Sequence, residues 1–259
     1  MTYSTFEIRA NWIADTLAPD EIGSRFLATL RRFEPLSPAM DNWMLMDMPA
    51  AKGVPLAEVA PRMAAFVEHN RVTDTDDAPH PEGGYWLLAR GSEVMREDGG
   101  PDDVNLTVIA ASEWNNEIEF EVGRGDLVNN FEIITYHLFH QVFGVLMETW
   151  PCPWGVAYYF GDDPAANKNY KRHTFNLPWL GYLSPALAIG LEPPPELICE
   201  RTQGGGVILS AVAAVIDQGN LDHTRRADLL EAILIERIGV GASTGLSRPA
   251  EHPARVGPY

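Results

Sequence analysis

The most apolar stretch of the chain, residues 131–160, predicts a buried helix followed by a strand. Between positions 134 and 150, apolar side chains occur at almost every angle of a helical wheel, and a helix with this pattern packs inside a protein. Pro151 and Pro153 end the helix, because proline has no N–H to donate. Aromatic and β-branched residues at 154–160 then indicate a strand. We therefore expect a central helix packed on a sheet.

The N-terminal part predicts a strand and two helices. Residues 6–13 alternate apolar with polar side chains, as in a half-buried strand, and Glu7, Arg9 and Asn11 are the polar ones. A helix begins at Pro19, since proline suits the first helical position. Its expected buried face consists of Ile22, Phe26, Leu30 and Phe33. Residues 42–48 are interpreted as a connector, and residues 55–70 as a second helix whose regular part begins late because of Pro61.

The rest of the chain predicts further strands and a last helix. The expected strands are residues 85–90, 104–111, 117–122, 173–183, 197–201 and 207–215. Residues 104–111 and 117–122 should pair antiparallel, and the glycines at 204–206 indicate a hairpin. The last helix spans residues 220–238 and ends at Gly239. Its expected buried side chains are Leu221, Leu229, Ala232, Ile233 and Ile238.

These elements predict an α+β protein, with mixed or antiparallel sheets packed against about four main helices, the central one buried. A chain of 259 residues, 46% of them hydrophobic, can bury a large core. We expect one domain over residues 1–240, or two fused lobes at about 1–130 and 131–240. Residues 241–259, rich in Gly, Pro and Ser, are expected to form a flexible tail.

Negative charge is concentrated in the middle of the chain. The formal net charge is −17, and residues 70–132 alone hold 15 acidic and four basic residues. Such a field repels nucleic acid and attracts a basic partner. An acidic surface that only keeps the protein soluble is the simpler interpretation of the same composition.

Cysteine usage and hydropathy indicate a cytoplasmic protein. Cys152 and Cys199 lie far apart in apolar sequence, so we expect two reduced, buried thiols and no cysteine-based metal site. The start of the chain lacks the pattern of a secretory signal. The longest uncharged apolar run, residues 207–216, is about half of the ~20 residues that a membrane helix needs.

Several patterns in the sequence resemble chemical motifs, and none of them predicts a catalytic or metal site. Residues 241–245 match a GxSxG spacing without the strand and helix that this motif requires. His137 and His140 stand three apart on the central helix, but packed core histidines are the commoner case. The aspartates at 74–77 and 102–103 lack calcium-loop spacing. No cofactor and no metal are expected.

A row of three carboxylates lies on the predicted strand 117–122. Glu117, Glu119 and Glu121 should face outward, about 6.6–6.8 Å apart, because alternate residues of a strand share one face. We expect a solvent-facing row to keep near-normal acidity, and therefore to suit the binding of a cationic surface better than acid–base catalysis.

The C-terminal half resembles a known family. WPCPWGVAYY (150–159) follows the long helix, and LPWLGYLSPALA (177–188), ELICERTQGGGVILSA (196–211) and NLDHTRRADLLEAIL (220–234) come after it. This order, together with FEIRANWI at the start, is similar to the immunity protein 52 family of bacterial polymorphic-toxin systems. The resemblance covers nearly the whole chain to about residue 238.

The resemblance implies a non-enzymatic protein that binds and neutralises a cognate toxin. In this family the toxin is often a nuclease delivered by type VI or related secretion, so the expected partner has a basic surface, while no nucleic acid or membrane is bound. Carboxylates would then stand in for the phosphates of the nuclease substrate. The expected contact residues are Asp74, Asp76, Asp77, Trp86, Asp102, Asp103, Trp114, Glu117, Glu119 and Glu121.

Two other function classes stay open. A hydrolase or lyase would require acids that converge in a pocket with His137 or His173. An acidic adaptor protein would have no toxin target. The sequence does not indicate a homo-oligomer.

Overall fold

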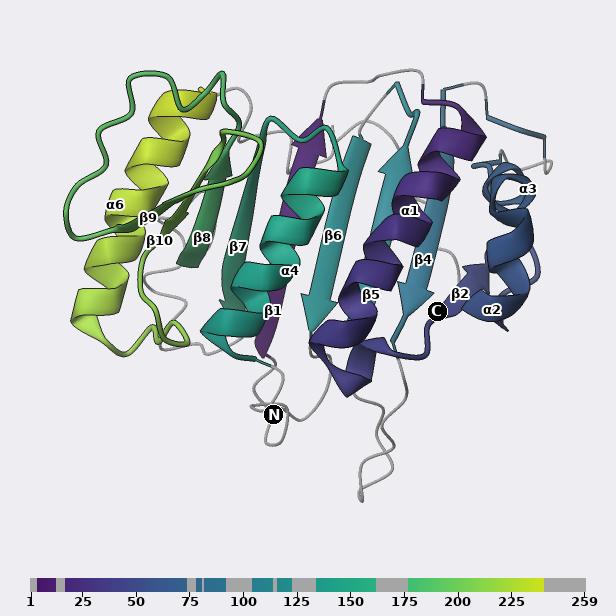
Figure 1. Cartoon of the computed structure of the whole chain (residues 1–259), viewed down its shortest axis with the longest axis horizontal. Helices are drawn as coiled ribbons and strands as arrows, with labels where there is room; N and C mark the ends of the chain where they lie inside the picture. Colours follow the sequence, from purple (N-terminus) through teal and green to yellow (C-terminus); the bar gives the residue numbers. More distant parts are fainter. Residues whose placement is uncertain are drawn as a thin grey trace.

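The computed structural model describes residues 4–12, 17–73, 78–80, 82–91, 104–113, 116–122, 134–161 and 177–239. The strands are β1 (Ser4–Trp12), β2 (Met44–Asp47), β3 (Lys52–Pro55), β4 (Tyr85–Arg90), β5 (Val104–Ala110), β6 (Asn116–Val122), β7 (Trp154–Gly161), β8 (Leu177–Leu183), β9 (Ile198–Arg201) and β10 (Val207–Ser210). The helices are α1 (Pro19–Phe33), α2 (Leu56–Val59), α3 (Met63–His69), α4 (Tyr136–Thr149) and α6 (Leu221–Ile238). Together they form an α+β fold (Figure 1), as expected.

The strands join into one ten-stranded antiparallel sheet. Its order is β3, β2, β4, β5, β6, β1, β7, β8, β10, β9. The first strand of the chain therefore lies in the middle of the sheet and pairs with β6 on one side and β7 on the other. Strands of residues 44–122 form one half of the sheet, strands of residues 154–210 form the other, and β1 joins them.

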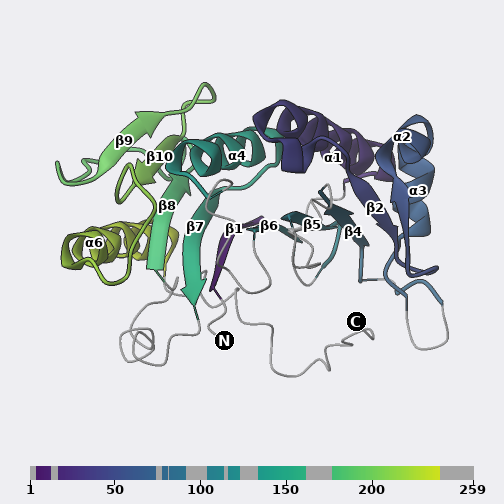
Figure 2. The ribbon, with the colours of Figure 1, turned by 90° about the horizontal axis from the view of Figure 1, so that it is seen from below.

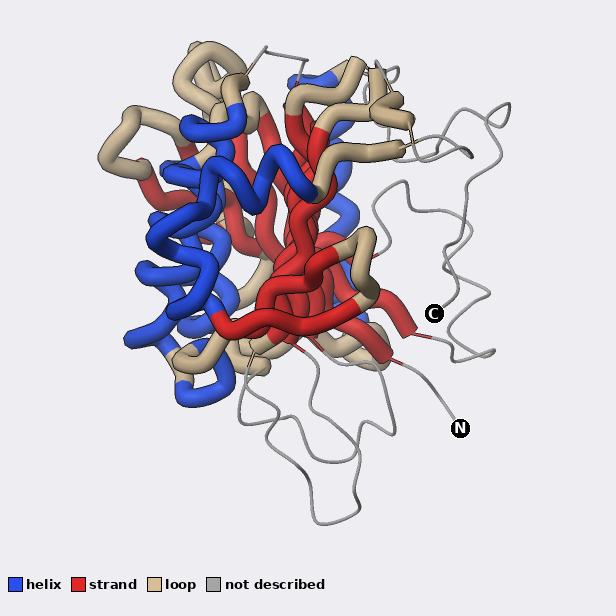
Figure 3. The backbone as a smooth tube through the Cα atoms, turned by 90° about the vertical axis from the view of Figure 1, so that its right-hand side faces the viewer, coloured by secondary structure: helices blue, strands red, loops and turns tan. Residues whose placement is uncertain are grey.

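One face of the sheet carries a layer of helices. Figure 2 shows α1 and α4 side by side over this face, with α2 and α3 beyond α1, and Figure 3 shows helices and sheet as two layers. The core between them is aromatic: the ring of Phe120 on β6 lies 5.5 Å from Phe33 of α1 and 6.1 Å from Phe139 of α4. We call this side of the sheet the helix face.

The last helix, α6, packs on the opposite side of the sheet, against β8. Gly181 pairs with Val156, which in turn pairs with Arg9, so position 181 points away from the helix face, as Arg9 does. A Cβ at Gly181 would stand 2.9 Å from Leu234 and 3.1 Å from Leu230. Because glycine has no side chain, α6 can pack directly on the sheet at this position.

The helix at 134–150 and the face of the helix from Pro19 are confirmed. The helix from Pro19 is α1, and the expected side chains of its buried face are all fully buried: Ile22, Phe26, Leu30 and Phe33. In α4, seven apolar side chains are buried, but His137, Gln141 and Glu148 are exposed, so this helix lies in the outer layer with one stripe open to solvent.

Other expectations need correction. Residues 42–48 are not a connector: β2 and β3 form a hairpin at the edge of the sheet. The helix expected at 55–70 is interrupted by a 3₁₀ turn at Ala60–Arg62, which contains Pro61, and its longer regular part, α3, begins only at Met63, as expected from that proline. Cys199 is exposed on β9, whereas Cys152 is buried, and burial raises the pKa of the Cys152 thiol.

The buried face of α6 also differs from the prediction. The buried residues are Ala227, Leu230, Glu231 and Leu234. Leu221 is 85% exposed, and Ala232 is exposed as well. Apolar residues occur on several sides of α6, so the helix sequence alone does not predict which side is buried. The buried side is decided by the space above Gly181.

Within the described ranges, no helix has the length and apolar character that crossing a lipid bilayer requires.

Candidate interaction face

Glu117, Glu119 and Glu121 lie on the side of β6 that points away from the helices. Their neighbours Ile118, Phe120 and Val122 are fully buried under α1 and α4. The alternation of the strand therefore places the three carboxylates on the opposite side of the sheet, as expected. We call this opposite side, over β4, β5, β6 and β1, the acidic face.

Arg9 of β1 lies between acidic residues on this face. Its Nη2 donates to Oε2 of Glu119 at 2.8 Å and lies 3.5 Å from Oε2 of Glu7, while its Nε lies 3.3 Å from Oε1 of Glu117. The hydroxyl of Tyr158 on β7 donates to Glu7. These five residues, which we call the Arg9 cluster, connect the three central strands of the sheet.

The Arg9 cluster is half-buried, which corrects the expectation of a solvent-facing row and, at Glu119, the expectation of near-normal acidity. The Glu119 side chain keeps only 24% of its surface exposed, and Glu117 only 16%. Burial raises the pKa of Glu119 to about 7; Arg9 opposes this rise, and Glu7, Glu117 and Glu121 add to it. Burial also raises the pKa of Tyr158. For Arg9, burial is outweighed by Tyr158 and the carboxylates, so its pKa is raised and its positive charge is secure.

Trp86 shares this face with the carboxylates. Leu87 and Ala89 of β4 are buried, so Trp86 points to the other side of the sheet. It pairs with Ile109, which pairs with Glu117. Its indole Nε1 is buried and has no hydrogen-bond partner in the described part of the chain. The structure thus brings together four of the expected contact residues.

The other expected contact residues lie outside the described ranges. They are Asp74, Asp76, Asp77, Asp102, Asp103 and Trp114.

The two helix histidines do not join the carboxylate row. His137 is exposed on α4, over the helix face, and therefore on the other side of the sheet from Glu119. His140 lies 3.5 Å from Glu200 of β9, and its ring is 5.6 Å from that of Tyr136. Among the described residues, no group of three or more His, Cys, Asp or Glu side chains could hold a metal ion.

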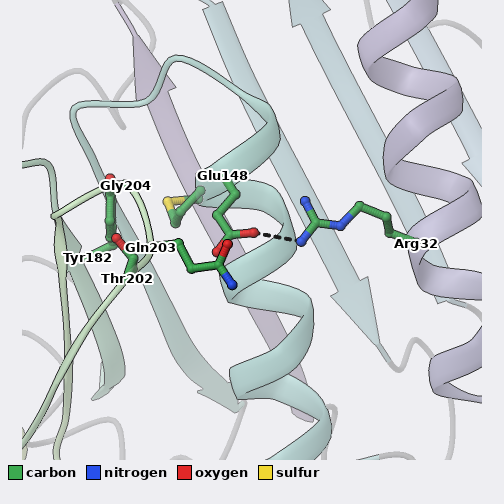
Figure 4. Close-up of a pocket in the computed structure, with 7 residues that line it drawn as sticks. Arg32, Glu148, Tyr182, Thr202, Gln203 and Gly204 are labelled. Atoms are coloured by element: carbon green, nitrogen blue, oxygen red, sulfur yellow. Dashed lines mark hydrogen bonds and ion pairs between the residues drawn. The ribbon is translucent and has the colours of Figure 1, made fainter.

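A notch of about 360 Å³ opens on the helix face, between α1, α4 and the β9–β10 turn. Figure 4 shows an ion pair at its rim, in which Arg32 donates to Glu148 at 2.6 Å. The other lining residues are Met147, Tyr182, Thr202, Gln203 and Gly204. The two charged residues of the lining, Arg32 and Glu148, therefore pair with each other.

Sequence reasoning missed the basic centre of the acidic face. Glu7 and Arg9 were recognised as the polar side of a strand, but Arg9 is 110 residues from Glu119 and Glu7 is 151 residues from Tyr158 in the sequence. The available signal was the matching alternation of residues 6–13 and 117–122, which lets the polar sides of both strands meet when they pair.

The sequence matches no protein-family model and no curated protein in the comparisons made. In structure, the chain is similar to the Pseudomonas aeruginosa type VI secretion system (T6SS) protein PA0821, with a TM-score of 0.51 and 14% sequence identity. The match covers 90% of this chain and 72% of that chain. At this level of identity the likeness establishes a common fold with that protein.

Proposed function

We propose that this chain is an immunity protein that binds a cognate toxin and neutralises it, without catalysing a reaction. The observation that carries the proposal is the fold similarity to a T6SS protein over 90% of the chain. The immunity protein 52 resemblance of the sequence points to the same biological system, and within it to the role of toxin inhibitor. The toxin would be an effector delivered by type VI or related secretion, and the inhibitor would protect the producing cell and its kin.

The acidic face is the proposed contact surface. It holds Glu7 and the three glutamates of β6, and Trp86 adds an aromatic side chain of the kind that often anchors interfaces. A nuclease has a basic surface for its phosphate-bearing substrate, and carboxylates can occupy that surface. With a net charge of −17, the chain would also attract such a toxin over a distance.

A binding experiment with a charge-matched control tests the surface. The test variant is Glu117→Gln/Glu119→Gln/Glu121→Gln, which removes three carboxyl groups without placing lysines against Arg9. The control variant is Glu58→Gln/Glu192→Gln/Glu236→Gln, which removes three charges from exposed positions outside the acidic face. Both are titrated with the toxin domain encoded next to the gene, at 50 mM and 500 mM salt.

The proposed surface predicts that the test variant binds the toxin at least about tenfold more weakly at low salt, equivalent to about 1.4 kcal/mol. The control variant should bind as the wild type does. High salt should weaken wild-type binding, because salt screens exposed charges. Equal affinity of test variant and wild type would exclude the acidic face as the interface, whereas absence of any wild-type binding would contradict the immunity role itself.

A further inference from the structure

The guanidinium of Arg9 lies among three carboxylates at the centre of the sheet, and one of its nitrogens, Nη2, serves two of them. Arg9 Nη2 lies 2.8 Å from Glu119 and 3.5 Å from Glu7, so these two acids share a single positive charge. Glu7 also accepts a hydrogen bond from Tyr158. The only hydrogen bond that the described residues give to the Glu119 carboxylate comes from Arg9. Of the two acids, Glu119 is therefore the one that gains more by becoming neutral.

The surroundings of Glu119 favour its neutral form. Among the described residues, the charged and titratable groups that face it are Glu7, Arg9, Glu117, Glu121 and Tyr158. Its neighbour across the β5 side is Thr107, which does not titrate. Four acidic groups thus surround one base in a half-buried site, where an additional negative charge is poorly solvated. Consistent with this geometry, the pKa of Glu119 is raised to about 7.

We propose that the Arg9 cluster is a proton-binding site at the junction of the two halves of the sheet: Glu119 takes up a proton as the solution becomes mildly acidic, and the β1–β6 junction is more stable in the protonated form. When Glu119 is neutral, Arg9 pairs with the carboxylates of Glu7 and Glu117 alone. The repulsion between the Glu119 charge and the neighbouring carboxylates is then removed. It also makes the acidic face less negative by one charge. Proton uptake at Glu119 requires no partner protein.

The direction of the stability change follows from linkage. The unfolded chain would protonate this glutamate only near its ordinary pKa of 4.5, whereas the folded chain does so near 7. Folding therefore takes up a proton between these two values. The stabilisation is complete below the lower value and is lost as the pH rises through the upper one.

Carbon-13 NMR of the glutamate side-chain carboxyls tests the proposal directly on the wild-type protein. We expect one glutamate to titrate with a midpoint near pH 7, and its signal to be missing from the Glu119→Gln variant. Because the wild-type titration is read by itself, the test does not depend on the stability of the variant. If every glutamate of the folded protein titrates below pH 6, the proposal is wrong.

Thermal unfolding provides a second readout. The amide of Glu119→Gln resembles the protonated acid, so this variant should melt several degrees above the wild type at pH 8 and by a clearly smaller margin at pH 5.5, where wild-type Glu119 is protonated in the folded chain but not yet in the unfolded one. The control is Glu58→Gln, at an exposed position on α2, which should follow the wild type at both pH values. A constant difference between Glu119→Gln and wild type across this pH range would contradict the proposal.

Discussion

Gly181 of β8 and Leu234 of α6 lie so close together that a Cβ at position 181 would stand 2.9 Å from Cδ2 of the leucine. This contact fixes which side of α6 is buried. We predict that Gly181→Ala destabilises the protein by about 1–3 kcal/mol, the usual cost of overpacking a core. Chemical denaturation measures this loss.

The control for this prediction is Gly204→Ala, since a Cβ at Gly204 meets no atom within 4 Å. This variant should be within about 0.5 kcal/mol of the wild type, as expected for a surface substitution. In a double-mutant cycle, Leu234→Ala should relieve part of the cost of Gly181→Ala. Additive costs would show that the two positions are not in contact.

A buried hydrogen bond ties the end of α4 to α1: the indole N–H of Trp150 donates to the hydroxyl of Thr29 at 3.0 Å. Thr29→Val keeps the shape of the side chain and leaves this N–H without an acceptor. The expected loss of stability is about 1–3 kcal/mol. Thr29→Ser, which retains the hydroxyl, should lose less, and equal losses in the two variants would argue against the hydrogen bond.

Asn220 caps α6 through its side-chain oxygen, which accepts from the backbone N–H groups of Asp222 and His223 at 3.0 and 3.4 Å. Asn220→Ala should cost about 0.5–2 kcal/mol, the range for losing a helix N-cap. Asn220→Asp keeps an acceptor at this position and should fold with nearly wild-type stability in the same denaturation assay. If both variants lose the same amount, the cap does not contribute.

Removal of Arg9 should destabilise the protein in a pH-dependent way. Arg9→Met leaves the carboxylates of the cluster without their shared cation, at an expected cost of about 1–3 kcal/mol. The cost should be larger at pH 8 than at pH 5.5, because Glu119, with a pKa of about 7, is neutral at the lower pH. Denaturant midpoints at both pH values measure it. Arg62→Met, at an exposed position, is the control, and an equal cost of Arg9→Met at both pH values would contradict the assigned protonation.

Local patterns predicted most helices and strands but not the contacts between distant ones. The buried face of α1 follows from Ile22, Phe26, Leu30 and Phe33, because one periodic stripe leaves no alternative. The hairpin of β2 and β3 was missed because the edge strand β3 has only four residues, one of them Pro55. Short strands carry little periodic signal.

In the candidate site, too, the local pattern predicted the direction of a side chain but not its contact with a distant strand. The outward direction of Glu119 follows from alternation within β6, whereas its partner Arg9 depends on the pairing of strands that are more than 100 residues apart. Burial of this pair, and with it the raised pKa of Glu119, is a property of the assembled sheet. The sequence of either strand alone does not predict this burial or the raised pKa.

The most direct test of the proposed function is growth rescue. The toxin domain encoded next to the gene is expressed in a susceptible host, with this chain or with an empty vector, and the complex is then isolated from the surviving cells. The immunity proposal predicts that cells grow only when the chain is present, and that the two proteins copurify at low salt. Cells that die with and without the chain, together with no copurification, would contradict it.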